Sequence, residues 1–399
     1  MKKPELLSPA GDLARLKTAI RYGADAVYIG GTSFSLRARA SNFTLDDIKE
    51  ACEFAHMHGA RVHVTVNMIP HEEDFEGFAQ YVEKLQDFGV TAAICASPAY
   101  MEIIREKAPR LEIHCSTQLS IHNVQAARFY AKNLGVSRVV LARECSMDEV
   151  RSITRECGIE TEAFIHGGMC VSYSGRCVLS NRMTLRDANR GGCAQSCRWQ
   201  YHVFDGNKEL SSDMKFTMGS KDLCAVNHVY SLMEAGVDSF KIEGRMKTEY
   251  YVASIVSAYR ALIDAIYENQ GPLESQALEW HRAQVLKGEN RRTWGGFYDN
   301  PGGEDSLIYQ ANSNADVSHD FLGTIVGREG RMLVVETRNP FSQGEEVELL
   351  CRVGQKRFTL GRMIDGEGCE IERSRHPMAL VKIETDVDAE VGDLLRRAR

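Results

Sequence analysis

The first two-thirds of the chain alternates between two patterns of apolar residues. Short β-rich runs are followed by longer segments with helical spacing of apolar positions, such as TLDDIKEACEFAHMHG and MDEVRSITRECG. Seven runs come first, and an eighth, VDSFKIEG, spans 237–244; the seven are PELLSPAG, ADAVYIG, ARVHVTVNM, TAAICASP, LEIHCSTQ, SRVVLARE and IETEAFIHG. Eight β/α units predict an α/β fold, a closed TIM-like (β/α)8 barrel over residues 1–270. An open doubly wound sheet competes, but no GxGxxG loop follows the first run.

Helix boundaries within this region follow from capping residues. Thr44 and Ser146 precede amphipathic segments and are predicted N-caps, while Gly59 and Gly158 are predicted to end the same helices. A long helical segment runs from residue 247 to about residue 267. The cysteine-rich stretch over 166–235 then becomes an insertion between strands seven and eight.

The last third of the chain has a different texture. Residues 271–318 are rich in Gly, Asn, Asp and Ser and are predicted to be a connector. From residue 319 to 399 short alternating strands are separated by turns such as REG and SQGE. This pattern predicts a small all-β domain, a barrel or a sandwich.

Composition narrows the functional classes. The chain has 399 residues and a net charge of −7, which argues against indiscriminate coating of nucleic acid but leaves room for a local basic patch. No apolar run approaches the ~20 residues that span a bilayer, so no membrane partner is expected. The stretch MKKPELLSPAGD lacks the apolar core of a signal peptide, and we therefore expect a cytoplasmic protein.

Cysteines gather in the insertion with the spacing C-x6-C-x15-C-x3-C. In a reducing cytosol such thiols indicate a metal centre rather than disulfides. The alternatives are an iron–sulfur cluster, a structural zinc ion and unliganded thiols. Glycines between them permit turns with positive φ, and five arginines over 176–198 offset a negative cluster, bind phosphates or form a solvated face. The candidate ligands are Cys170, Cys177 and Cys193, with Cys197 or Cys224 as the fourth.

Polar residues near the ends of the barrel strands form a second candidate set. The carboxyl ends of the strands carry the chemistry in such barrels. Arginines there suit a ligand with carboxylates, and paired carboxylates suit proton transfer if burial raises a pKa. Glu162 and Glu243 are equally compatible with salt bridges to Arg143 and Arg245. The predicted catalytic residues are His166, Glu162 and Glu243, and the predicted substrate-binding residues are Asn67, Gln118, Arg143, Tyr173, Lys241 and Arg245.

One stretch carries a family resemblance. EAFIHGGMCVSYSGRCVLS, residues 162–180, resembles the signature E-x-F-x-H-G-x-x-C-x-x-x-S-G-x-C-x-x-S of peptidase family U32. GGCAQSCRW, SKDL, DSFKIEGRMK and the opening ELLSPAGD also resemble that family, so the likeness covers essentially the whole chain. Gly168 stands where Ala or Ser is more usual.

The resemblance implies several expectations. The family name implies a collagenase-like peptidase, whereas better-understood members hydroxylate RNA bases or the ubiquinone ring. Those members carry a [4Fe–4S] cluster on cysteines matching Cys170, Cys177 and Cys193. The branch that the chain most resembles implies tRNA hydroxylation to 5-hydroxyuridine at the wobble position, with prephenate as the source of the hydroxyl group. A paralogous partner chain or a second copy is a further expectation.

For the peptidase alternative the sequence offers only Cys170 with His166 as a thiol–base pair. It contains neither HExxH nor GxSxG.

Overall fold

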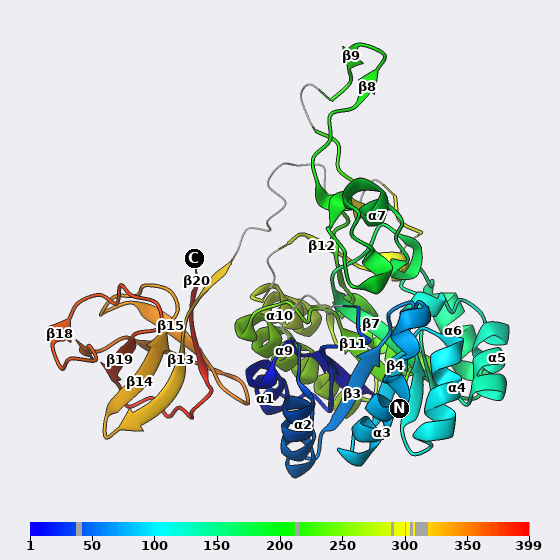
Figure 1. Ribbon diagram of the computed structural model, residues 1–399. Helices are drawn as coiled ribbons and strands as arrows, with labels where there is room; N and C mark the ends of the chain where they lie inside the picture. The colour runs from blue at the N-terminus through cyan, green and yellow to red at the C-terminus, as the bar shows by residue number, and fades with distance from the viewer. Residues whose placement is uncertain are drawn as a thin grey trace.

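The computed structural model describes residues 1–36, 42–211, 215–288, 291–299, 301–303, 306–307 and 318–398. Its larger domain is a closed parallel barrel (Figure 1). The last barrel strand pairs with both the first and the seventh, which closes the ring and confirms the predicted (β/α)8 barrel. The barrel strands are β1 (Glu5–Pro9), β2 (Ala26–Gly30), β3 (Arg61–Val66), β4 (Ala92–Cys95), β5 (Glu112–Cys115), β6 (Arg138–Val140), β7 (Glu160–Gly167) and β11 (Ser239–Ile242).

Helices surround this ring, and their ends follow the predicted caps. Thr44 accepts a hydrogen bond from the Asp47 amide, and Ser146 accepts one from the Glu149 amide. Gly59 and Gly158 follow the same two helices at φ of +72° and +79°. The helices are α1 (Leu13–Arg21), α2 (Leu45–Met57), α3 (Phe78–Asp87), α4 (Pro98–Lys107), α5 (Val124–Leu134), α6 (Met147–Glu156), α8 (Val229–Ala235) and α9 (Glu249–Asn269).

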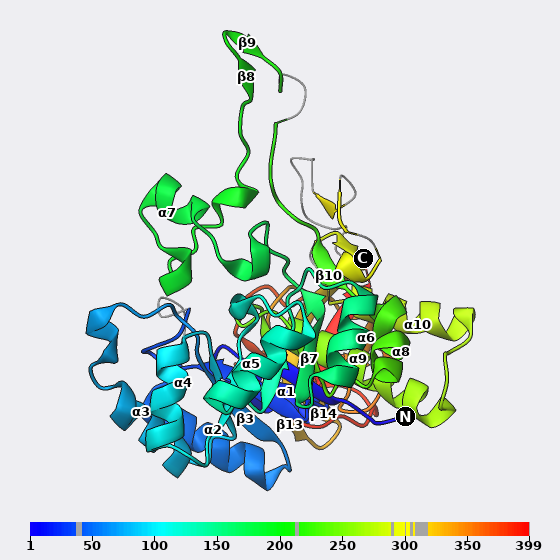
Figure 2. The same cartoon turned by 90° about the vertical axis from the view of Figure 1, so that its right-hand side faces the viewer.

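The insertion lies over the carboxyl end of the barrel strands (Figure 2). It contains the short helix α7 (Leu179–Thr184) and the hairpin β8 (Phe204–Asp205) and β9 (Lys208–Glu209), which projects away from the barrel. Strand β10 (Asp222–Cys224) returns the chain and pairs antiparallel with β7. The insertion is thus attached to the barrel wall at both of its ends.

The segment predicted as a connector contains regular structure in its described part. Helix α10 (Ser275–Leu286) packs beside α9, and β12 (Thr293–Trp294) pairs with β10. Residues 308–317 of this segment lie outside the described residues. The segment therefore contributes a helix to the barrel domain and a strand to the insertion.

The C-terminal domain is an antiparallel sheet, as the alternating pattern predicts. Its strand order is β16-β15-β20-β13-β14-β19-β17-β18. The strands are β13 (His319–Glu329), β14 (Met332–Thr337), β15 (Glu346–Leu350), β16 (Gln355–Thr359), β17 (Met363–Ile364), β18 (Glu370–Ile371), β19 (Leu380–Glu384) and β20 (Leu394–Ala398).

Specific contacts join this sheet to the barrel domain. The Tyr22 hydroxyl donates to the Leu350 carbonyl at 2.9 Å, and Arg21 forms an ion pair with buried Asp393 at 2.8 Å. The ring of Tyr250 on α9 stacks on Phe321 with centroids 5.2 Å apart. The sheet packs beside α1 and α9, away from the insertion (Figure 1). Among the described residues, no helix has the length and apolar character needed to cross a bilayer.

Three histidines on the barrel strands, in β3, β5 and β7, are buried and make the stability of the domain sensitive to acid. Burial lowers the pKa of His63 to about 4, that of His166 to about 3, and that of His114 well below its usual value. Each stays neutral in the folded state but binds a proton in the unfolded state below pH 6.5. Stability is therefore fully present above pH 6.5 and is lost as pH falls toward the folded pKa values.

We expect the free energy of unfolding to fall between pH 6.5 and 5 by about 1 kcal/mol per pH unit for each of these histidines. Urea unfolding at pH 7.0, 6.0 and 5.0 measures the slope. Most carboxylates remain ionised in this window, so a flat profile would contradict neutral burial of all three rings.

Candidate active site

A cavity of about 430 Å³ lies between the carboxyl ends of the barrel strands and the insertion. The barrel supplies its floor and the insertion its roof. Most of the predicted substrate-binding residues line it, together with the four cysteines of the C-x6-C-x15-C-x3-C pattern. The lining includes Asn67, Gln118, Arg143, Lys241, Glu243, Arg245, Cys170, Cys177, Cys193 and Cys197.

The fifth candidate thiol lies elsewhere. Cys224 is in β10 opposite His166 of β7, and its sulfur accepts a hydrogen bond from the Tyr259 hydroxyl at 3.9 Å. It is not part of the cavity lining. Of the two alternatives for the fourth ligand, only Cys197 therefore shares a cavity with Cys170, Cys177 and Cys193.

The insertion holds its thiols through local hydrogen bonds. The Asn189 side chain accepts from the Cys177 amide at 3.3 Å and donates to the Cys177 carbonyl at 3.0 Å. The Ser172 amide donates to the Cys170 sulfur at 3.4 Å, which favours a thiolate or a metal-bound sulfur. Burial raises the pKa values of Cys170 and Cys197, so these thiols need a cation or a metal to ionise at neutral pH.

The spacing of the sulfurs bears on the zinc alternative. Sulfurs around one tetrahedral zinc ion lie about 3.8 Å apart, because each Zn–S bond is about 2.3 Å. Within the described part of the chain, the ligand atoms of His122, Cys145 and Glu149 all lie within 4.8 Å of one another. No three of the four cavity sulfurs lie that close together. A single zinc ion bound by three of these thiols would therefore require their side chains to move closer together.

Cations cover the barrel side of the cavity. Lys241 lies 4.7 Å above the Tyr28 ring, and Arg143 lies 4.0 Å above the Phe164 ring. Arg245 donates to the Thr65 hydroxyl at 3.2 Å. A Cβ at residue 30 would collide with the Arg245 guanidinium, so Gly30 is required for this arginine to reach the cavity. Arg186 and Arg198 add two more positive charges to the cavity lining. Glu243 is the one carboxylate in the described lining that faces these five cations.

Two polar side chains complete the cavity floor. Gln118 is buried and lines the cavity, and its Nε2 is a buried donor with no hydrogen-bond partner among the described residues. The Asn67 amide oxygen accepts from the Leu36 amide at 3.4 Å. Tyr28 and Thr65 also line the cavity and were missed by the sequence analysis. Both could have been found in the sequence, because alternate residues of β2 and β3 point into the barrel.

The two predicted catalytic carboxylates have different surroundings. Glu243 lines the cavity, where the Tyr28 hydroxyl donates to it at 3.3 Å and Arg143 approaches to 3.5 Å. Glu162 is fully buried below the cavity and bonds Lys241 at 2.6 Å and Arg138 at 3.2 Å. Burial pushes the pKa of Glu162 upward, but the charges of Lys241 and Arg138 outweigh it and lower the pKa to about 2. Glu162 is thus a fixed anion that holds Lys241 in place.

His166 also lies outside the cavity lining. Its Nδ1 is 3.3 Å from the Tyr259 hydroxyl on α9, so the ring faces the outside of the barrel wall. The reason is an irregularity where β7 pairs with β11: Lys241 pairs with Phe164, but the next residue, Ile242, pairs with His166. The predicted proton transfer by His166 has no direct path to a ligand in the cavity.

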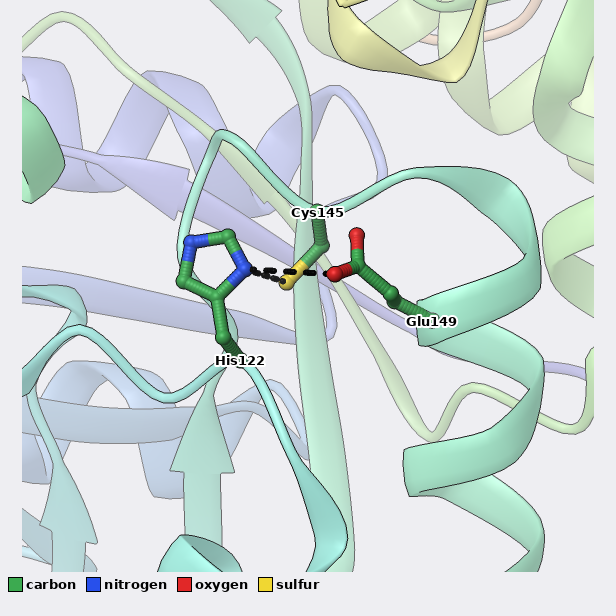
Figure 3. A group of neighbouring side chains, drawn as sticks. All are labelled: His122, Cys145 and Glu149. Carbon is green, nitrogen blue, oxygen red and sulfur yellow. Dashed lines mark hydrogen bonds and ion pairs between the residues drawn. The ribbon is translucent and has the colours of Figure 1, made fainter.

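Tyr173 is on the rim rather than in the cavity. Its ring stacks on His122 with centroids 5.1 Å apart. His122 Nδ1 lies 3.6 Å from the Cys145 sulfur and 3.7 Å from Glu149. Figure 3 shows these three side chains turned toward one another. The other oxygen of Glu149 caps α6, and burial raises the pKa of Cys145, so we interpret this group as an anchor for the insertion. The next residue along, Ser174, donates its amide to Glu144 at 2.6 Å.

These features define a class of protein: a (β/α)8 barrel whose mouth is closed by a cysteine-rich insertion, with four thiols and several cations around one cavity. Comparison with known proteins then places the chain. The sequence profile of peptidase family U32 matches residues 11–307, and that of the family's C-terminal domain matches residues 317–396. The chain belongs to peptidase family U32.

Three relatives extend this comparison. The chain is 41% identical to tRNA hydroxylation protein P1 of Bacillus subtilis, over 100% of this chain and 96% of that protein. It is 32% identical to tRNA hydroxylation protein P of Escherichia coli, over 92% and 90% of the two chains. It is 43% identical to the 23S rRNA 5-hydroxycytidine C2501 synthase of Escherichia coli, over 67% of this chain and 40% of that protein.

Proposed function

We propose that this protein is an RNA-modifying enzyme that hydroxylates the wobble uridine of tRNA to 5-hydroxyuridine. The observation that carries the proposal is the cavity in which Cys170, Cys177, Cys193 and Cys197 face the cations of the barrel mouth. The full-length likeness to two proteins named for tRNA hydroxylation supports tRNA as the substrate. The rRNA hydroxycytidine synthase supports chemistry at the same carbon of a pyrimidine. Such a substrate implies work in the cytoplasm.

The four cavity thiols would hold a [4Fe–4S] cluster, which supplies redox-active iron when bound. Prephenate, a dicarboxylate, is the proposed source of the hydroxyl group. Arg143 and Arg245 bind its carboxylates, and Lys241 adds a third positive charge fixed by Glu162. Gln118 donates a hydrogen bond from Nε2, and Glu243 accepts or returns a proton at the oxygen nearest Tyr28.

The peptidase alternative has less support from the geometry. Its thiol–base pair requires Cys170 and His166 in one site, but Cys170 lines the cavity while His166 lies with Tyr259. Hydroxylation of another RNA base or of a quinone ring would use the same cavity. Identification of the hydroxylated product distinguishes these alternatives from hydroxylation of the wobble uridine.

Nucleoside mass spectrometry tests the proposal. Total tRNA is compared between cells that contain the gene, cells that lack it and its paralogues, and cells complemented with it. Loss of 5-hydroxyuridine on deletion and its return on complementation are expected. A wobble uridine that stays hydroxylated in the deleted strain would overturn the proposal, and hydroxycytidine in rRNA serves as the parallel readout.

Arg143→Gln is expected to weaken prephenate binding about 10- to 100-fold, because one charge-assisted hydrogen bond to a carboxylate is lost. Isothermal titration of the anaerobic protein measures the dissociation constant. Arg182→Gln is the matched control, since Arg182 is exposed on α7 and does not line the cavity. Equal affinities for wild type and Arg143→Gln would place the dicarboxylate elsewhere.

A further inference from the structure

The projecting part of the insertion has no evident role in holding the thiols or the small-molecule cavity. We call it the arm and define it as residues 199–211 with 215 and 216. Its two strands are each two residues long, and Figures 1 and 2 both show it extending away from the barrel. An isolated two-stranded hairpin is marginal in water. The pairing of these two short strands therefore contributes little stability to the arm.

The arm also carries exposed apolar side chains. Large apolar residues usually pack inside, yet those of the arm face solvent. Trp199, Phe204, Leu210 and Phe216 are 44%, 57%, 58% and 40% exposed. Exposed apolar groups gathered on one element indicate a binding surface rather than scattered surface residues. Three of the four are aromatic.

The arm is joined directly to the thiol site. The carbonyl of Cys197, just before the arm, accepts from the Met218 amide at 3.0 Å and from the Thr217 hydroxyl at 3.2 Å, two residues that follow the arm. The Tyr201 hydroxyl donates to the Ser196 carbonyl at 2.7 Å. A molecule that lies along the arm therefore has one end at the cavity mouth.

Charge identifies the occupant. The neighbouring part of the insertion, residues 176–198, carries five arginines and one aspartate in a chain whose net charge is −7. Arg176 and Arg182 are exposed and form no ion pair within the described part of the chain. A polyanion fits this part of the insertion, in which α7 packs on the 196–198 turn at the base of the arm. Proteins bind unpaired nucleotides by stacking bases on aromatic rings and pairing phosphates with arginines.

We propose that the arm is the docking site for a single-stranded loop of the RNA substrate, with unpaired bases stacked on Trp199, Phe204 and Phe216. Arg176 and Arg182 bind the phosphates of the same loop. This assignment rests on the proposed function, because it assumes that an RNA base enters the cavity. It adds the element that selects a loop over a duplex.

The test uses the full-length, iron-containing protein and two RNA probes, an anticodon stem-loop and the same stem closed as a duplex. Fluorescence anisotropy gives both dissociation constants. Phe204→Ala is expected to weaken binding of the stem-loop about 5- to 150-fold and to change duplex binding little. Phe129→Ala on α5 is the matched control, because Phe129 is also 57% exposed. Iron content and melting temperature verify that each variant is folded.

Stem-loop affinity that is unchanged in both Phe204→Ala and Trp199→Ala would overturn the proposal. So would loss of self-association, measured by ultracentrifugation, with RNA affinity intact, since the arm would then bind protein. The two proposals fail separately. A wild-type protein that binds the loop through the arm but leaves wobble uridine unmodified refutes only the proposed reaction. One that hydroxylates the uridine equally well in Phe204→Ala refutes only the arm.

Discussion

Cys197→Ser is expected to remove bound iron and abolish wobble hydroxylation, whereas Cys224→Ser leaves both close to wild type. The four thiols at the cavity are the proposed ligands, and loss of one leaves a cluster with an incomplete thiolate set. Cys224 is in β10, outside the cavity lining, and its sulfur accepts a weak hydrogen bond from Tyr259 of α9. The two substitutions are chemically identical, so each controls for the other.

Iron and sulfide analysis of anaerobically purified protein, with its absorption spectrum, measures the first effect. Nucleoside mass spectrometry of complemented cells measures the second. Loss of iron in Cys224→Ser with retention in Cys197→Ser would reverse the assignment of the fourth ligand. Zinc in place of iron in the wild-type protein would contradict the cluster itself.

The barrel was predictable because its strands are separate apolar runs between well-capped helices. Strand ends also located Asn67, Gln118, Arg143 and Arg245 at the mouth, since parallel strands place their carboxyl ends on one face. The same reasoning put His166 at the mouth, whereas the structure places its ring beside Tyr259 and outside the cavity lining. By alternation from Glu162 and Phe164 it faces inward, but the irregular pairing of β7 with β11 turns it outward. A bulge of this kind cannot be predicted from the pattern of apolar residues in the sequence.

A second limit of the sequence-based prediction was how deep a side chain lies within the barrel. Glu162 faces inward, as alternation indicates. It lies two residues before Phe164 in β7, however, and this places it below the cavity, among Lys241, Arg138 and Glu5. The third limit was the path of the backbone through the insertion. The contributions of Arg186 and Arg198 to the cavity depend on turns with positive φ at Leu185 and Gln195, where glycine is absent.

Glu162→Gln is expected to lower the free energy of unfolding by about 3–5 kcal/mol at pH 7, since it leaves buried cations without a full set of partners. Lys241 loses its bonded carboxylate, and Arg138 keeps Glu5 and Glu160 as its ion-pair partners among the described residues. Because the pKa of Glu162 is about 2, its stabilising charge is present above the unfolded value near 4.5 and is lost as pH falls through 2. Urea unfolding at neutral pH therefore measures the full effect.

Glu160→Gln is the matched control. Glu160 is on the same strand and also bonds Arg138, but its side chain is 44% exposed, so water replaces the lost charge. A loss of at most about 1 kcal/mol is expected there. The Glu162 variant should also bind prephenate more weakly, because Lys241 loses the ion pair that holds its side chain in place. Equal losses of stability in the two variants would mean that burial does not set the strength of this network, and Lys241 would then need no anion beneath it to act at the cavity.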